Sequence, residues 1–211
     1  MTTLIPRNAP RDLLEGGPLV ATRSPQPQPR RYFALTRADL DAHPLAACGQ
    51  TAVAALLERP LASVMPTFPP QRWCNLRDMM AALRSLGVRW QQSPPDTRAT
   101  CTRVRQRPAT WPRRGLVQIF FHGPWDAPEV PFAVSFKASH WVAVAPLTTP
   151  DGKPVRGAEP MVFDVNTLDR GVNAGWAHRS WWEKQILAPL IAETKRATGG
   201  WWVRAGLEVA R

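Results

Sequence analysis

The feature that most constrains the fold is a change in hydrophobic period part-way along the chain. Between Thr36 and Gly87, apolar residues recur at helical spacing and capping residues mark where helices begin and end. From Leu116 onward, short runs rich in β-branched and aromatic residues alternate with proline, glycine and aspartate, which is typical of strands. Helices followed by strands predict an α+β domain in which N-terminal helices pack on an antiparallel sheet.

Three helices are expected before residue 88. Thr36 and Asp39 form a capping-box pattern that opens a short helix ending at Pro44. The next helix, residues 48–58, is apolar nearly all round and should be buried. Asn75 opens the third helix, and Gly87 stops it.

The second half predicts strands and one further helix. The expected strands cover residues 116–121, 132–136, 140–145, 161–165, 201–205 and 207–209. Ser180 and Glu183 form a second capping-box pattern, which predicts an amphipathic helix kinked at Pro189. Trp182 takes a core-facing position on that helix.

The first 31 residues read as a tail. They contain six prolines and five arginines, and the run Pro-Gln-Pro-Gln-Pro-Arg-Arg at 25–31 favours polyproline II. We therefore expect residues 1–31 to be extended and residues 32–211 to form one domain.

The net charge of +11 predicts an acidic partner. It arises from 27 Lys and Arg against 16 Asp and Glu, and residues 93–115 alone carry six arginines. The tail and this segment, which reads as a surface loop, are expected to contact nucleic acid, an anionic polymer or an acidic protein in a salt-dependent way. A GC-rich genome also explains abundant arginine and alanine.

Several classes are excluded. No apolar run approaches the ~18 residues of a membrane span, and residues 1–14 lack the apolar stretch of a secretory signal. Three cysteines make no disulfide framework, so we expect a cytoplasmic protein, with a virion component or delivered effector as the alternative. Cys74, Cys101 and the histidines other than His140 lack metal-ligand spacing, and no glycine-rich phosphate loop occurs, so no cofactor is expected.

Three residues have the placement that a thiol nucleophile needs. Cys48 begins the buried helix, where the helix N-terminus stabilises a thiolate. His140 begins a strand and can meet the sulfur, and Asp164 ends the next strand and can fix the histidine tautomer. Taken singly, each also has a structural interpretation: a small buried hydrophobe, a core histidine and a turn residue.

In this order, the segments carrying these residues resemble a known family. Cys48-Gly-Gln-Thr with the apolar run after it, His140-Trp-Val-Ala-Val, and Phe-Asp164-Val-Asn are similar to a papain-like cysteine peptidase of the bacterial or phage type close to the peptidase C39 family. The resemblance covers about residues 40–170. It implies a papain-like fold, a peptide or protein substrate, Cys48 as nucleophile, His140 as base and Asp164 as the residue that orients it.

One departure from the family pattern bears on activity. The family places a glutamine, which helps bind the oxyanion, about six residues before the cysteine, and here that position is Ala42. Asn166 is a second candidate for the orienting residue, since papain itself uses asparagine. Two alternatives stay open: a peptidoglycan amidase or endopeptidase, and a non-catalytic papain-like module that binds a partner.

Overall fold

The structure is a computed structural model that describes residues 35–70, 73–94, 96, 109–127, 129–130, 138–170 and 175–210. The expected tail, residues 1–31, and the expected strand at 132–136 lie outside these residues. So does most of the arginine-rich segment 93–115.

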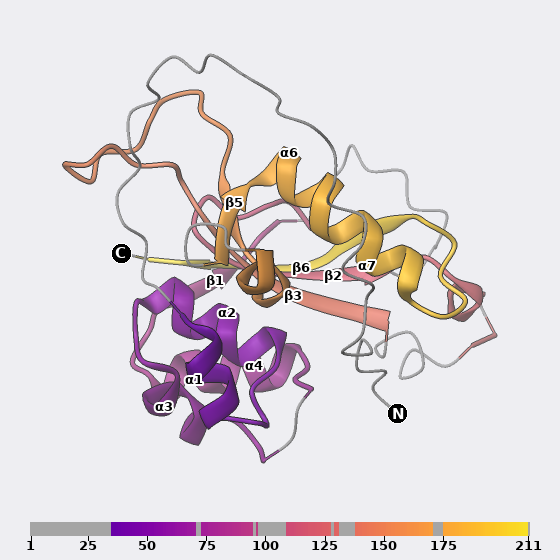
Figure 1. The fold of residues 1–211 in the computed structure, drawn as a ribbon, viewed down its shortest axis with the longest axis horizontal. Coiled ribbons are helices and arrows are strands. Elements are labelled where there is room, and N and C mark those ends of the chain that lie inside the picture. Colours follow the sequence, from indigo (N-terminus) through magenta and orange to yellow (C-terminus); the bar gives the residue numbers. More distant parts are fainter. Residues whose placement is uncertain are drawn as a thin grey trace, which may run out of the picture.

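A six-stranded antiparallel sheet forms the centre of the fold (Figure 1). Its strands are β1 (Trp90–Gln92), β2 (Gly115–Phe121), β3 (Ser139–Ala145), β4 (Met161–Phe163), β5 (Trp176–His178) and β6 (Trp201–Val209). They lie in the order β1-β6-β2-β3-β4-β5, and every neighbouring pair is antiparallel. The expected combination of helices with an antiparallel sheet is therefore confirmed.

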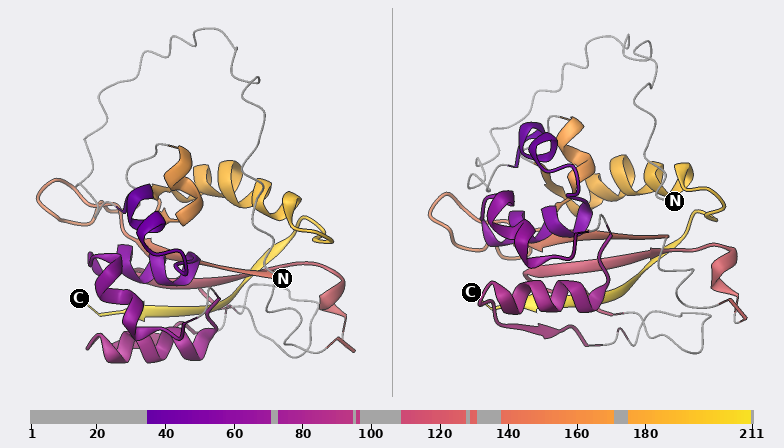
Figure 2. Two further views of the ribbon diagram at one scale, coloured as in Figure 1. Left: turned by 60° about the horizontal axis from the view of Figure 1, so that its bottom comes forward. Right: turned by 90° about the horizontal axis from the view of Figure 1, so that it is seen from below.

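Helices cover both faces of this sheet. They are α1 (Arg37–Ala42), α2 (Cys48–Leu57), α3 (Leu61–Val64), α4 (Leu76–Ser85), α6 (Arg179–Trp182), α7 (Ala188–Glu193), the π-helical turn η7 (Glu183–Leu187) between the last two, and the 3-10 turns η2 (Met65–Thr67), η3 (Pro124–Asp126) and η5 (Val165–Arg170). One core joins α2 and α4 to the sheet through Leu116, Trp141 and Leu207. A second core joins the C-terminal helical segment, from α6 through α7, to the opposite face of the sheet through Val117 and Val142. Figure 2 shows the two groups of helices from two further directions.

Local capping explains the N-terminal helices. Thr36 Oγ1 accepts a hydrogen bond from the Asp39 N–H, and the Asp39 carboxylate accepts one from the Thr36 N–H. Asn75 caps α4 in the same way, and Gly87 after it takes a φ of +72°, which favours glycine. The three predicted helices before residue 88 are thus confirmed.

The C-terminal helix begins differently from the prediction. Ser180 is not a capping residue, because the helix starts at Arg179 and its N-cap, His178, makes no side-chain cap. The backbone N–H and hydroxyl of Ser180 instead bind the carboxylate of Glu159. A distant acid therefore accepts the backbone N–H that the local pattern assigned to Glu183. The two strands expected at 201–209 are also one strand, β6, whose pairing with β2 shifts register between Gln118 and Ile119.

Gly49 lies where α2 meets the segment before α4. A Cβ on this glycine would be 2.0 Å from Cys74 Sγ and 3.2 Å from Met79 Sδ. The absent side chain lets Cys74, which is buried, pack directly on the first turn of α2. Trp141 links the same segment to the sheet, since its indole N–H donates to the Cys74 carbonyl at 3.0 Å.

This contact predicts a rescue. Gly49→Ala should lower the free energy of unfolding by about 1–3 kcal/mol, because the added methyl overlaps a buried sulfur. Adding Cys74→Ala removes that sulfur, so the double variant should recover at least about 1 kcal/mol relative to the sum of the single variants. Urea denaturation of the two single variants and the double variant measures this coupling. Simple additivity would show that the two sites do not compete for space.

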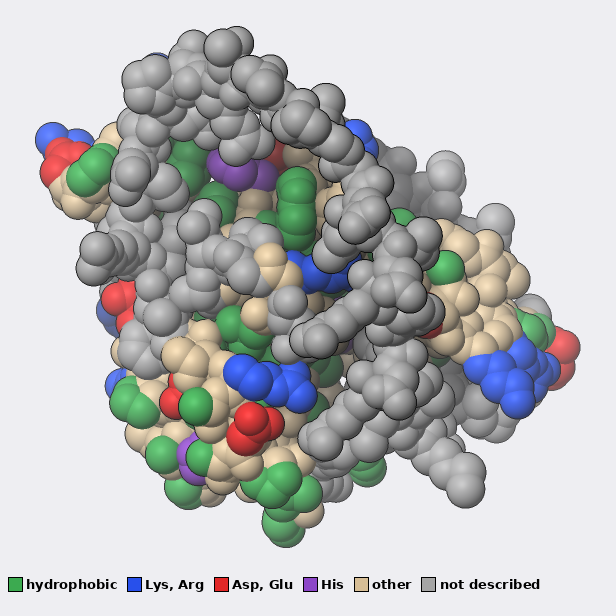
Figure 3. Space-filling model, in the orientation of Figure 1, with side chains coloured by type: hydrophobic (Ala, Val, Ile, Leu, Met, Phe, Trp, Pro, Cys, Tyr) green, Lys and Arg blue, Asp and Glu red, His purple; other side chains and the backbone are tan. Residues whose placement is uncertain are grey.

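The excess positive charge lies mainly outside the described residues. Residues 1–34 carry five arginines against two acidic residues, and residues 97–108 carry four arginines and none. On the face seen in Figure 3, basic and acidic side chains of the described residues are interspersed.

Arg114, from the basic segment, donates to the Leu56 carbonyl at 2.6 Å and so caps the C-terminal end of α2. None of the helices in the described ranges has the length and apolar character that crossing a bilayer requires.

Candidate active site

Cys48 is the first residue of α2. N–H groups in the first turn of a helix have no acceptor within that helix, so they attract negative charge at this end. Gln50 stabilises the turn from inside: it is fully buried, and its Oε1 accepts the N–H of the N-cap residue Ala47 at 3.2 Å. Thr51 adds a hydroxyl that donates to the carbonyls of Ala47 and Cys48. Cys48 as a residue is half-buried, and these bonds give it a rigid support.

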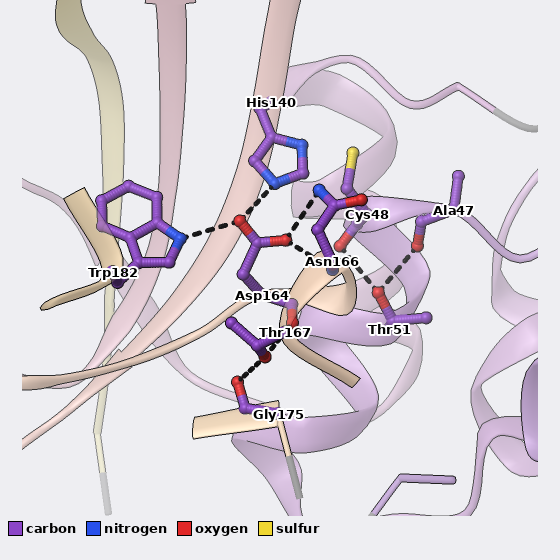
Figure 4. Close-up of polar contacts among 9 residues, drawn as sticks. All are labelled: Ala47, Cys48, Thr51, His140, Asp164, Asn166, Thr167, Gly175 and Trp182. Atoms are coloured by element: carbon purple, nitrogen blue, oxygen red, sulfur yellow. Dashed lines mark hydrogen bonds and ion pairs between the residues drawn. The ribbon is translucent and has the colours of Figure 1, made fainter. Parts of the chain in front are cut away.

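His140 is the second residue of β3. Strand β4 pairs only with Ala143 to Ala145, so the first residues of β3, His140 among them, extend beyond the end of β4. The Nε2 of His140 lies 2.8 Å from Oδ2 of Asp164, and a carboxylate can only accept, so Nε2 carries the proton. Figure 4 shows Nδ1 on the side of the ring that faces the Cys48 sulfur.

Asp164 follows β4 and is completely buried. Four donors reach its two oxygens. Oδ2 accepts from His140 and, at 2.8 Å, from the indole N–H of Trp182. Oδ1 accepts from the backbone N–H of Asn166 at 2.9 Å and from its Nδ2 at 3.0 Å. Each carboxylate oxygen therefore accepts two hydrogen bonds, which uses the acceptor positions that an ionised carboxylate has.

The loop after Asp164 is fixed by its own hydrogen bonds. The Thr167 hydroxyl lies 2.5 Å from the Asp164 carbonyl and 2.6 Å from the Gly175 carbonyl. The Asp164 N–H donates to the same Gly175 carbonyl at 3.1 Å. These bonds hold the backbone on which the carboxylate stands.

The three side chains shift one another's pKa values. Burial alone would raise the pKa of the Cys48 thiol, but the charge and hydrogen bond of His140 and the backbone N–H of Trp141 outweigh burial and lower it. Burial alone would lower the pKa of His140, yet Asp164 and Cys48 raise it well above its usual range. Burial likewise opposes ionisation of Asp164, whose pKa is nevertheless lowered by His140, Trp182 and Asn166. The site thus favours a thiolate beside an imidazolium.

No protein-family model, curated protein or solved structure matches the chain.

The structure brings together the three residues singled out from the sequence. Asn166, the second candidate for orienting His140, donates to Asp164 and so supports the carboxylate. The core-facing position predicted for Trp182 is confirmed, but its hydrogen bond to Asp164 was not predicted. Nothing in the helical spacing of Trp182 could have indicated it, because the partner is 18 residues away on another element.

Other chemistry is not indicated near these residues. Within the described ranges, no three His, Cys, Asp or Glu side chains lie together as metal ligands would. An open groove lined by Arg113, Arg156 and several prolines, among them Pro146, follows the far end of β3, away from His140. The described site brings together a thiol, an imidazole and a carboxylate, the set of groups that covalent catalysis by a thiol uses.

Proposed function

We propose that the chain is a papain-like cysteine peptidase, similar to the peptidase C39 family, that cleaves a peptide or isopeptide bond. One observation supports this more than any other. The proton on Nε2 of His140 is held by Asp164, which leaves Nδ1 for the sulfur of a cysteine at a helix N-terminus. A core cysteine and a core histidine would not need that tautomer.

The chemistry follows from these positions. The Cys48 thiolate attacks the substrate carbonyl carbon, and His140 then gives its Nδ1 proton to the leaving amine. Water, deprotonated by the same nitrogen, attacks the resulting thioester and releases the acid, which returns the thiol to its starting state. Asp164 stays ionised throughout and keeps the imidazolium oriented.

The oxyanion would be bound by the backbone N–H of Cys48. The family's second donor is a glutamine, whereas Ala42, the last residue of α1, is an exposed alanine. Gln50 does not replace it, since its side chain is buried and its Oε1 binds Ala47. Losing one such donor typically costs ~10²–10³ in rate. Slow turnover is the expected consequence.

Ala42 is also the observation that favours the second candidate, a papain-like module that binds a partner without cleaving it. That function does not need a reactive thiol. The reactivity of Cys48 therefore separates the two.

Cys48 should react with iodoacetamide at pH 6 at least about 100-fold faster than Cys74 or Cys101, because only a thiolate attacks and an ordinary thiol with a pKa of about 8.5 is mostly protonated there. Burial, with the nearby charges of Cys48 and Asp78, raises the pKa of Cys74, so this thiol should stay unreacted. Mass spectrometry of peptides from partly alkylated protein gives the three rates.

The matched control is His140→Ala, which removes the imidazolium and should abolish the advantage of Cys48. Equal alkylation of Cys48 in both proteins, at the rate of an ordinary thiol, would contradict the peptidase and leave the binding module.

A further inference from the structure

Trp182 lies outside the proposed triad and contacts it directly. It is completely buried, and its indole Nε1 lies 2.8 Å from Oδ2 of Asp164, the same oxygen that accepts from His140 at 2.8 Å. Figure 4 shows the indole and the imidazole approaching that oxygen from different sides. One oxygen thus receives one donor from β3 and one from α6.

The position of Trp182 is itself fixed by neighbours outside the triad. Trp111 packs edge-on against it, with ring centroids 6.3 Å apart and planes at 75°, and Trp111 meets Trp201 in the same way. The Arg179 guanidinium lies 4.2 Å from the Trp111 ring centre and also donates to Glu183 at 2.7 Å. Trp111 therefore supports the indole of Trp182, and Trp111 is itself held by Trp201 and Arg179.

The helix that carries Trp182 changes geometry directly after it. Residues Glu183–Leu187 form a π-helical turn, and Trp182, Ile186 and Leu187 all stay buried. Such turns are rare and often occur beside functional sites. Here the turn keeps the helix packed on the sheet while Trp182 points at Asp164.

Building on the proposed peptidase function, we propose that Trp182 is a positioning residue that locks the Asp164 carboxylate on His140. Asn166 holds Oδ1, and without the indole His140 would be the one donor to Oδ2 among the described residues. The carboxylate could then turn about its Cβ–Cγ bond and carry the imidazolium out of line with the sulfur. A locked carboxylate keeps Nδ1 aimed at Cys48 and so keeps the thiolate stable.

The test is the pH dependence of Cys48 alkylation by iodoacetamide in Trp182→Phe, which removes the indole N–H and keeps an aromatic ring. The lower inflection, where the thiolate forms, should move to higher pH by about half a unit or more because the imidazolium is less well held. Turnover of a cleavable peptide should fall about 10-fold in kcat, as is usual when a partner that orients a functional histidine is lost, with KM little changed.

Trp202→Phe is the matched control. Trp202 is also buried, packs edge-on against Phe120, and its indole nitrogen has no hydrogen-bond partner among the described residues. The Trp202→Phe variant should lose as much packing as Trp182→Phe, while the inflection of Cys48 alkylation stays at the same pH. If Trp182→Phe does not fold, 3-benzothienylalanine at position 182 keeps the bicyclic shape and replaces only the N–H with sulfur.

An inflection that stays in place or moves to lower pH in both position-182 variants would overturn the proposal. It would mean that the Asp164 carboxylate, freed from the indole N–H, stays in place and attracts the His140 imidazolium at least as strongly as before. This outcome is distinct from failure of the peptidase function itself. That failure would appear in the unchanged protein as a Cys48 without low-pH reactivity.

Discussion

Cys48→Ala is expected to abolish peptide hydrolysis, by about 10⁴-fold or more, because the atom that attacks the carbonyl is gone. The fold should be retained. The side chain is small and half-buried, alanine is a good helix former, and the buried stretch from Gly49 to Leu56 is untouched. Turnover of a cleavable peptide, with circular dichroism and urea denaturation of the same samples, checks both statements.

Cys74→Ala is the control, since it removes the other described thiol without touching the triad. It should keep its activity and lose some stability. If Cys48→Ala instead keeps the biological activity of the chain, catalysis is not its function, and the binding module becomes the better explanation.

Asp164→Asn is expected to cost both activity and stability. An amide has one acceptor oxygen, so whichever way it lies, its NH₂ group meets two of the four donors that the carboxylate now satisfies. We expect kcat to fall by on the order of 10²-fold or more, because the wrong histidine tautomer is favoured. The free energy of unfolding should fall by about 3–5 kcal/mol, as when one member of a buried charged pair is removed.

The stability loss has a predicted pH dependence. The folded-state pKa of Asp164 is lowered, so its contribution is fully present above the unfolded value of about 3.9 and is lost as pH falls through the lower folded value. Urea denaturation between pH 7 and pH 3 should show the difference between the two proteins shrinking at the acid end.

Asn166→Ala provides the comparison. It removes one of the four donors, while the backbone N–H of residue 166 continues to bind Oδ1, so both losses should be smaller. Equal losses in the two variants would contradict the role of Asp164 as the main support of His140.

The sequence was sufficient wherever structure is decided by neighbours in the chain. The capping boxes at Thr36 and Asn75 each involve residues three apart, so their helices could be predicted with their ends. The long strands β2 and β3 carry enough apolar residues to show their period. The candidate triad was found because each member lies at the start or end of such an element.

Contacts between distant segments could not be predicted. Glu159 binds Ser180 from 21 residues away, which overturned the expected capping box. Strands β1 and β5 have three residues each and include polar side chains, so no apolar run marks them as one marks the equally short β4. No local pattern predicts the packing of Cys74 on Gly49 or the hydrogen bond from Trp182 to Asp164, because both depend on how whole elements pack.

The strand order has a consequence for how the protein is made. Strand β6 lies between β1 and β2, and β6 is the strand with which β1 pairs. Because residues 93–200 separate β1 from β6 in the chain, this pairing must wait until the segment after residue 200 has been synthesised. Pairing across such separations is slow to form. Because the second core also needs Val203 from β6, the nascent chain on the ribosome would carry Cys48 and His140 before it can support them. The packing behind the proposed triad would therefore be complete only once β6 has been synthesised and has joined the sheet.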